Sequence, residues 1–234
     1  VKIHTIFIGS KIPHLRQLVK ILAYKSMTFI DLTIFRRDAT IKMDILEQGA
    51  TAMKWMIASD LHGSAYYCRQ MIEAFQREGA DRLLLLGDLL YHGPRNDLPR
   101  DYAPKEVIPL LNGMKQKLLC VRGNCDAEVD QMVLEFPILA DYAVLPVGER
   151  LVYATHGHVH NLKNLPPLAP GDILLHGHTH IPAWTKFGDG NLYLNPGSLS
   201  IPKEGSAHSY MTLEENTFCW KTLEGNMYHV LELK

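Results

Sequence analysis

ASDLHGS, residues 58–64, is the stretch around which the rest of this sequence is interpreted. It overlaps a short apolar run, residues 55–58, that is typical of a buried β-strand. Asp60 and His62 are two positions apart, and an extended chain would point both side chains the same way. A carboxylate and an imidazole at a strand end, followed by a turn-forming glycine, can bind a divalent metal ion. The stretch therefore predicts a metal-binding strand end.

Four later apolar runs end in polar residues of the same kinds. Residues 82–86 and 118–121 lead into an aspartate and an asparagine. Residues 151–154 and 173–175 lead into histidine-rich segments. Mixed carboxylate, amide and imidazole donors suit Mn, Fe or Zn better than Ca or Mg, and seven donors suit two metals that share a carboxylate. The candidate ligands are Asp60, His62, Asp88, Asn124, His156, His178 and His180.

Between these strands the sequence predicts helices. Residues 66–78 place apolar side chains at helical spacing before Gly79, and a second helix is predicted over residues 104–114. Strands that alternate with helices indicate an α/β domain, whose ligands bind beyond the carboxyl ends of the strands. Short alternating segments within residues 192–231 predict antiparallel strands that complete a second sheet. We expect one domain, residues 53–234.

Composition restricts the class of protein. The 234 residues carry a formal net charge of −1, which argues against a broad basic surface for nucleic acid. No run approaches the roughly 18 uninterrupted apolar residues of a membrane helix. The four cysteines show neither paired metal spacing nor a dense disulfide pattern, so the expected location is the cytoplasm. We expect a small-molecule substrate and no membrane association, and the sequence leaves open whether the chain forms a homo-oligomer.

Residues 1–52 differ from the remainder in charge and in pattern. They carry eight Lys/Arg and four Asp/Glu, a net charge of +4, whereas the remainder carries −5. Residues 15–24 fit a basic amphipathic helix, which would suit a membrane surface or a partner protein. The preferred interpretation is that Met53, directly before the first strand, is the native start. The extension would then be a mis-assigned start or an artificial addition.

Five motifs occur in a characteristic order: Asp-x-His, Gly-Asp, Gly-Asn-x-Asp, His-Gly-His and Gly-His-x-His. In this order and strand context they resemble the calcineurin-like metallophosphoesterase superfamily. Residues 59–64, 92–96, 122–126 and 195–198 are similar to segments of the small bacterial phosphodiesterases of the YfcE type. The resemblance covers essentially all of residues 53–234 and not the segment before them.

The resemblance implies a four-layer α/β/β/α sandwich, with two mixed sheets flanked by helices. Mn²⁺ is the usual activating ion in such proteins, with Zn²⁺, Fe, Ni²⁺ or Mg²⁺ as alternatives. Two cations roughly 3.5–4 Å apart polarise phosphoryl oxygens, and a metal-bridging hydroxide attacks phosphorus in line. The implied ligands form two sets bridged by Asp88, namely Asp60, His62 and His180 for one metal and Asn124, His156 and His178 for the other.

Four further residues are candidates for catalysis or substrate binding. Most of the superfamily has histidine where this chain has Cys125, and a thiol with an ordinary pKa of about 8.5 is a different proton donor from an imidazole near 6.5. We therefore expect diesters with good leaving groups to be favoured over unactivated phosphomonoesters. Asp126 would orient Cys125 or Asn124. Arg95 would hold a phosphate oxygen or be a solvated loop residue, and His158 would face substrate or support the ligands.

The sequence thus predicts a metal-dependent phosphodiesterase that acts on a small phosphodiester. The enzymatic alternatives are a phosphomonoesterase or protein phosphatase and a single-stranded nuclease. The alternative from another class is a non-catalytic scaffold of the same fold, similar to the retromer subunit, in which metal sites are damaged. All seven candidate ligands are retained here, which favours the enzyme over the scaffold.

Overall fold

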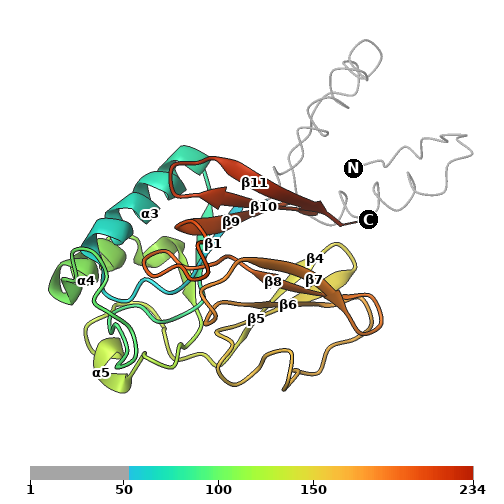
Figure 1. Cartoon of the computed structure of the whole chain (residues 1–234), viewed down its shortest axis with the longest axis horizontal. Helices are drawn as coiled ribbons and strands as arrows, with labels where there is room; N and C mark the ends of the chain where they lie inside the picture. The colour runs from blue at the N-terminus through green and yellow to red at the C-terminus, as the bar shows by residue number, and fades with distance from the viewer. Residues whose placement is uncertain (1–52, 234) are drawn as a thin grey trace, which may run out of the picture. The chain divides into compact units, whose positions relative to one another are not determined.

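The computed structural model describes residues 53–233, which form two β-sheets with helices beside them (Figure 1). Our expectations for residues 1–52, including the amphipathic helix over residues 15–24 and the native start at Met53, lie at or outside this range and stay predictions. Within the described range, no helix combines the length and apolar character needed to cross a membrane.

The first sheet has six strands in the order β11-β10-β9-β1-β2-β3. Strands β1, β2 and β3 are parallel to one another, and β9 pairs antiparallel with β1. The expectation that the C-terminal strands complete the second sheet is wrong for β9, β10 and β11, because alternation reports which face is buried and not which strand is the neighbour. The bounds are β1 Trp55–Ala58, β2 Arg82–Leu85, β3 Leu118–Cys120, β9 Ser209–Glu214, β10 Thr217–Thr222 and β11 Met227–Glu232.

The second sheet has five strands in the order β4-β5-β6-β8-β7. Its three central strands are parallel, and the two edge strands pair antiparallel with them, so both sheets are mixed as expected. The edge strands β4 and β7 escape prediction because their side chains are mostly not buried and one strand contains a proline. The bounds are β4 Ala143–Val147, β5 Arg150–Thr155, β6 Ile173–His176, β7 Ala183–Phe187 and β8 Asn191–Asn195.

The predicted helices are present close to their expected bounds. Helix α3 (Ala65–Glu78) begins after Ser64, whose hydroxyl accepts a hydrogen bond from the Tyr67 N–H, and it ends at Gly79, which has φ 60°. Helix α4 (Pro104–Asn112) is two residues shorter than predicted and is followed by the 3₁₀ turn η2 (Lys115–Lys117). The short helix α5 (Glu128–Gln131) was not predicted.

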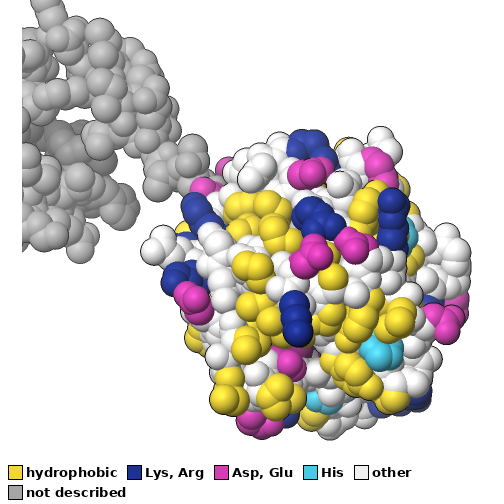
Figure 2. All heavy atoms as spheres, turned by 90° about the vertical axis from the view of Figure 1, so that its left-hand side faces the viewer, with side chains coloured by type: hydrophobic (Ala, Val, Ile, Leu, Met, Phe, Trp, Pro, Cys, Tyr) yellow, Lys and Arg dark blue, Asp and Glu magenta, His cyan; other side chains and the backbone are white. Residues whose placement is uncertain are grey.

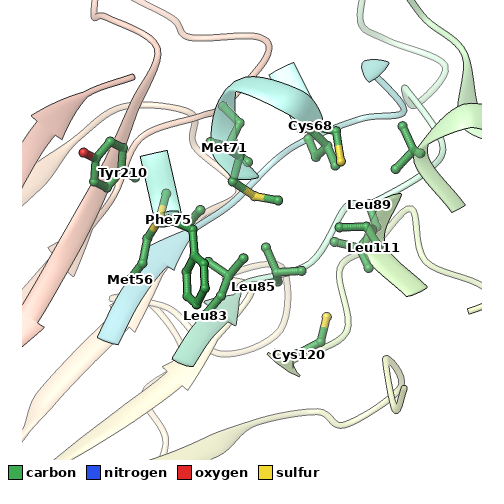
Figure 3. Close-up of a cluster of buried hydrophobic side chains, with 14 of the residues drawn as sticks. Met56, Cys68, Met71, Phe75, Leu83, Leu85, Leu89, Leu111, Cys120 and Tyr210 are labelled. Atoms are coloured by element: carbon green, nitrogen blue, oxygen red, sulfur yellow. The ribbon is translucent and has the colours of Figure 1, made fainter. Parts of the chain in front are cut away.

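Two hydrophobic layers hold these elements together. In the first, Met71 and Phe75 of α3 pack against Met56, Leu83 and Leu85 on one face of the first sheet (Figure 3). In the second, alternate residues of the same strands, with residues of β5, β6 and β8, fill the space between the two sheets. Strand alternation thus assigns each side chain to one layer.

The outer face of the second sheet differs from the expected helical layer. No helix occurs in residues 156–172 of the described chain, a segment that contains Gly157, Gly171 and three prolines. These residues disfavour a helix, so irregular chain occupies this position: Leu162 lines a cavity together with Tyr193 of β8. The α/β fold of two mixed sheets is confirmed, with α3 and α4 against the first sheet only.

Candidate metal centre

All seven candidate ligands follow strand ends and converge at one site. They come from five segments, which follow β1, β2, β3, β5 and β6. We call Asp60, His62 and His180 the inner set and Asn124, His156 and His178 the outer set.

The inner set is buried, although His180 also lines the cavity described below. Its members are at most 3% exposed. The Asp60 Oδ1 atom lies 3.3 Å from Nε2 of His180 and 3.7 Å from Nε2 of His62. The two Nε2 atoms are themselves 3.3 Å apart. Three potential ligand atoms therefore face one small volume.

The outer set converges as closely but is more open. Nε2 of His156 lies 3.0 Å from Oδ1 of Asn124 and 3.1 Å from Nδ1 of His178. His156 is buried, whereas His178 is half-buried and Asn124 is exposed. Burial and the adjacent His156 ring lower the pKa of His178 to about 4, which favours the neutral imidazole that binds metal.

Asp88 lies between the two sets. Its Oδ2 atom is 3.7 Å from Nε2 of His62 and 3.5 Å from Nε2 of His156, while Oδ1 accepts a hydrogen bond from the Cys125 N–H at 2.8 Å. One carboxylate oxygen therefore faces both sets. The backbone connects the sets as well, because the N–H of His178 donates to Oδ2 of Asp60 at 3.0 Å.

Backbone carbonyls fix the tautomers of three imidazoles. Nδ1 lies 2.9 Å from the Tyr91 carbonyl in His62, 2.6 Å from the Leu86 carbonyl in His156 and 2.6 Å from a carbonyl in His180. A carbonyl can only accept, so Nδ1 donates its proton and, in each neutral ring, Nε2 keeps a lone pair directed into the site. Such an arrangement is typical of metal-binding histidines.

The electrostatics of the site favour an added cation. The Oδ1 atom of Asp60 is buried and accepts no hydrogen bond within residues 53–233. Although burial opposes ionisation, the imidazoles of His180 and His62 hold the pKa of Asp60 well below its ordinary value. Burial likewise opposes protonation of His156, yet Asp88 raises its pKa to about 9. Carboxylates and lone pairs that converge without enough donors fit divalent metal ions.

The backbone of the site is strained. Eight non-glycine residues in the described part of the chain have positive φ, and five of them are candidate ligands. The expectation that an extended chain aligns Asp60 and His62 is wrong, because β1 ends at Ala58 and both residues are left-handed, with φ of 59° and 49°. The side chains of Asp60 and His62 do lie close together as predicted, but a strained turn and not an extended strand brings them together. Such strain costs of order 1–3 kcal/mol per residue and clusters at functional sites. The five are Asp60, His62, Asp88, His178 and His180.

Neighbouring loops hold this strained turn. The hydroxyls of Ser198 and Ser200 each donate to the Asp60 carbonyl at 3.0 Å. Gly177 allows close approach, because a Cβ there would lie 2.7 Å from Oδ2 of Asp60. Ser198 belongs to the segment 195–198, which the sequence predicts to be mainly a tight turn that could close one side of the site. The hydrogen bond from Ser198 to the Asp60 carbonyl is the contact that the sequence does not predict.

The four other candidate residues lie near the site in different ways. Cys125 and Arg95 line a cavity of about 450 Å³ above the ligands, and the Cys125 thiol is half-buried. Among the described residues, no hydrogen bond joins the Asp126 carboxylate to the side chain of Cys125 or Asn124. The carboxylate instead accepts hydrogen bonds from three backbone N–H groups at the ends of β2 and β3, at 2.7–2.9 Å. His158 is exposed and lies beside His156, outside that cavity.

Comparisons with known proteins agree with this geometry. Residues 53–217 match the calcineurin-like phosphoesterase superfamily domain. The chain is 46% identical over 164 residues to phosphodiesterase YfcE of Escherichia coli (strain K12), which covers 70% of this chain and 89% of YfcE. It is 34% identical over 105 residues to probable metallophosphoesterase YsnB of Bacillus subtilis (strain 168), which covers 41% of this chain and 57% of YsnB.

A solved structure of Yfce, a phosphoesterase from E. coli, has a TM-score of 0.74 and 42% sequence identity, and the match covers 78% of this chain and 100% of that chain. The family and the converging donors both imply divalent metal ions. The chain therefore belongs to the calcineurin-like phosphoesterase superfamily and is a hydrolytic phosphoesterase.

Proposed function

We propose that this chain is a phosphodiesterase that hydrolyses small phosphodiesters with two divalent cations, Mn²⁺ being the activating ion. The observation that carries this proposal is the convergence of both ligand sets on Asp88. The name of the relative YfcE, phosphodiesterase, supports a diester as the substrate. The mixture of carboxylate, imidazole and amide donors supports Mn²⁺, Fe, Zn²⁺ or Ni²⁺ over Ca²⁺.

In this proposal the inner set and Asp88 hold one cation, and the outer set and Asp88 hold the other. When bound, two such cations polarise phosphoryl oxygens and lower the pKa of a water molecule that attacks phosphorus in line. The contribution of the chain is preorganisation: carbonyl-bound Nδ1–H groups orient His62, His156 and His180 before any ligand arrives.

The remaining candidates act on the substrate or its surroundings. Cys125 presents a neutral thiol to the cavity, and a thiol is a weak donor toward a leaving oxygen, so esters with good leaving groups are preferred. Arg95 lines the cavity wall and would hold a phosphate oxygen of the bound substrate. Asp126 keeps the loops that carry Asp88 and Asn124 together through backbone N–H groups. His158 supports His156 from the side.

The surface and the cysteines support a small substrate and a cytoplasmic location. On the face shown in Figure 2, acidic and basic side chains are interspersed among hydrophobic ones and form no broad basic area. A face of this kind is a poor match for nucleic acid. The four cysteines of the described chain are free, as is usual in a reducing compartment.

Hydrolysis of bis-p-nitrophenyl phosphate by metal-stripped protein tests the proposal. We expect activity on addition of Mn²⁺, a loss of about a thousandfold or more in Asp88→Asn, and no loss in Asp189→Asn, which changes an exposed aspartate in the loop between β7 and β8. Equal turnover in Asp88→Asn and wild type would remove Asp88 from the bridge. Faster hydrolysis of p-nitrophenyl phosphate or a phosphoserine peptide would instead favour the phosphomonoesterase alternative.

A further inference from the structure

The cavity above the candidate metal centre has two basic residues on its rim that neither ligand set uses. The cavity has a volume of about 450 Å³, and Asp88, Asn124 and His178 are among its lining residues. Arg95 reaches it from the loop after β2, and Lys203 reaches it from the loop between β8 and β9. Both side chains are exposed.

Arg95 differs from every other arginine in residues 53–233. Each of the others makes a hydrogen bond or an ion pair or lies over an aromatic ring. Within the described chain Arg95 has none of these partners, although Asn96 beside it is anchored by a hydrogen bond to the His92 carbonyl at 2.9 Å. A fixed loop therefore presents an uncommitted guanidinium to the cavity.

Lys203 is held at the opposite loop by its backbone. Its N–H donates to the His180 carbonyl at 3.2 Å, and its own carbonyl accepts a hydrogen bond from the Ser206 hydroxyl at 2.7 Å. The same loop anchors the ring of His180 through the Ile201 carbonyl. The position of Lys203 is thus coupled to a candidate ligand, while its ammonium group makes no ion pair with any described residue.

With two divalent cations bound, the positive charge in and around the cavity would exceed the single negative charge of a simple phosphodiester. Among the described residues that line it, Asp88 is the one carboxylate, and it lies buried between the ligand sets. If the proposed function holds, Asp60 and Asp88 offset only two of the four positive charges on two divalent cations. Arg95 and Lys203 then add two more positive charges, whereas a phosphodiester carries one negative charge.

We propose that Arg95 and Lys203 bind a second phosphate, so that the preferred substrates are phosphodiesters whose organic group carries an additional phosphate. This inference rests on the proposed function and specifies its substrate class. The cavity is within the 300–1,000 Å³ typical of small-molecule sites and is larger than one phosphoryl group requires. Arginine supplies a planar fork for phosphate oxygens, and lysine supplies a compact charge.

Two substrates with one leaving group test the inference: thymidine 5′-(p-nitrophenyl phosphate) and the same compound with a 3′-phosphate. We expect kcat/KM in Mn²⁺-loaded wild type to be about tenfold higher for the 3′-phosphorylated compound, because each exposed ion pair contributes up to about a fewfold. The ratio falls to about threefold in Arg95→Met or Lys203→Met and to about one in the double variant. Added 0.5 M NaCl lowers the wild-type ratio by screening.

The control is Lys117→Met, which removes an exposed lysine that lines none of the cavities near the site and leaves the ratio at about tenfold. Equal kcat/KM for the two compounds in wild type, or a ratio that both rim substitutions leave unchanged, overturns the inference. Failure to hydrolyse both of these compounds and bis-p-nitrophenyl phosphate refutes the proposed function instead. Calorimetric binding then decides the inference, since equal affinity for thymidine 3′,5′-bisphosphate and thymidine 5′-monophosphate contradicts it.

Discussion

The inner and outer sets each contain two imidazoles, but they differ in their oxygen donor, a carboxylate in Asp60 and an amide in Asn124, and in how firmly the fold holds them. The inner set is at most 3% exposed, and its Asp60 turn is held by two serine hydroxyls. The cavity is lined by the exposed Asn124 and the half-buried His178 of the outer set, whereas His180, the inner-set residue that also lines it, is buried. If the proposed function holds, we expect the inner set to bind its cation more tightly and the outer set to be the more accessible to substrate and to metal exchange.

The largest difference between the two sets should appear when one candidate ligand is removed from each set in separate variants and the loss of hydrolysis is compared. We expect Asp60→Asn to reduce Mn²⁺-dependent hydrolysis of bis-p-nitrophenyl phosphate by about a thousandfold or more, because a buried site with a missing carboxylate loses cation affinity. Asn124→Ala removes a neutral, exposed ligand, so we expect a loss of about 10–100-fold, partly restored by millimolar Mn²⁺. Steady-state kinetics over a range of Mn²⁺ concentrations measures both. Equal losses with equal rescue would contradict the distinction between the sets.

Displacement of the shared residue should affect both sets. A Cβ at Gly123 would lie 2.1 Å from Oδ1 of Asp88 and 2.3 Å from its backbone nitrogen. We therefore expect Gly123→Ala to lower turnover by about a hundredfold and to reduce the free energy of unfolding by about 1–3 kcal/mol, because the backbone must shift. In Gly113→Ala, where the nearest atoms are 3.4 Å away, turnover should be retained. Urea unfolding and activity assays measure both quantities, and normal activity in Gly123→Ala would show that Asp88 tolerates displacement.

Loss of the hydroxyls that hold the inner turn should have a smaller effect. Ser198→Ala and Ser200→Ala each remove a hydrogen bond to the Asp60 carbonyl, worth about 1 kcal/mol of stability. The double variant should bind the first Mn²⁺ about tenfold more weakly, while the second binding step changes little. Calorimetric titration with Mn²⁺ resolves the two steps. Equal weakening of both steps would show that the turn does not act on the inner set alone.

The smallest effect should come from Cys125, which lines the cavity beside the outer set. We expect Cys125→His to raise hydrolysis of p-nitrophenyl phosphate relative to bis-p-nitrophenyl phosphate by a fewfold, because an imidazole is a better proton donor to a leaving oxygen than a thiol is. A ratio of the two rates that equals the wild-type ratio would count against a role for this position.

Within each sheet the polar residues could be predicted to lie together, because the carboxyl ends of parallel strands share one edge: β1, β2 and β3 in the first sheet, and β5 and β6 in the second. Their conformation could not, since no sequence signal marks Asp60 or His178 as left-handed. The sequence predicts that Asp126 orients Cys125 or Asn124, whereas the structure shows that its carboxylate accepts hydrogen bonds from backbone N–H groups. Lys203 carried no signal, because nothing in the sequence places its loop over the site.

The sheet assignment failed for a related reason. Residues 209–213 are buried on both faces, because Tyr210 packs in the layer with α3 whereas Met211 and Leu213 pack between the two sheets. The pattern of apolar residues in these segments predicts that they are strands, but it does not predict which strands they pair with. Strand β9 pairs with β1, which lies far earlier in the sequence. Edge strands such as β7 have mostly unburied side chains, so their pattern resembles that of loops.

The central claim is that two cations occupy the inner and outer sets with Asp88 between them. Diffraction from Mn²⁺-loaded crystals at the manganese absorption edge tests it most directly. We predict two anomalous peaks roughly 3.5–4 Å apart, one bound by the inner set, one by the outer set and both by Asp88. A single peak, or two peaks that do not share Asp88, would contradict the account.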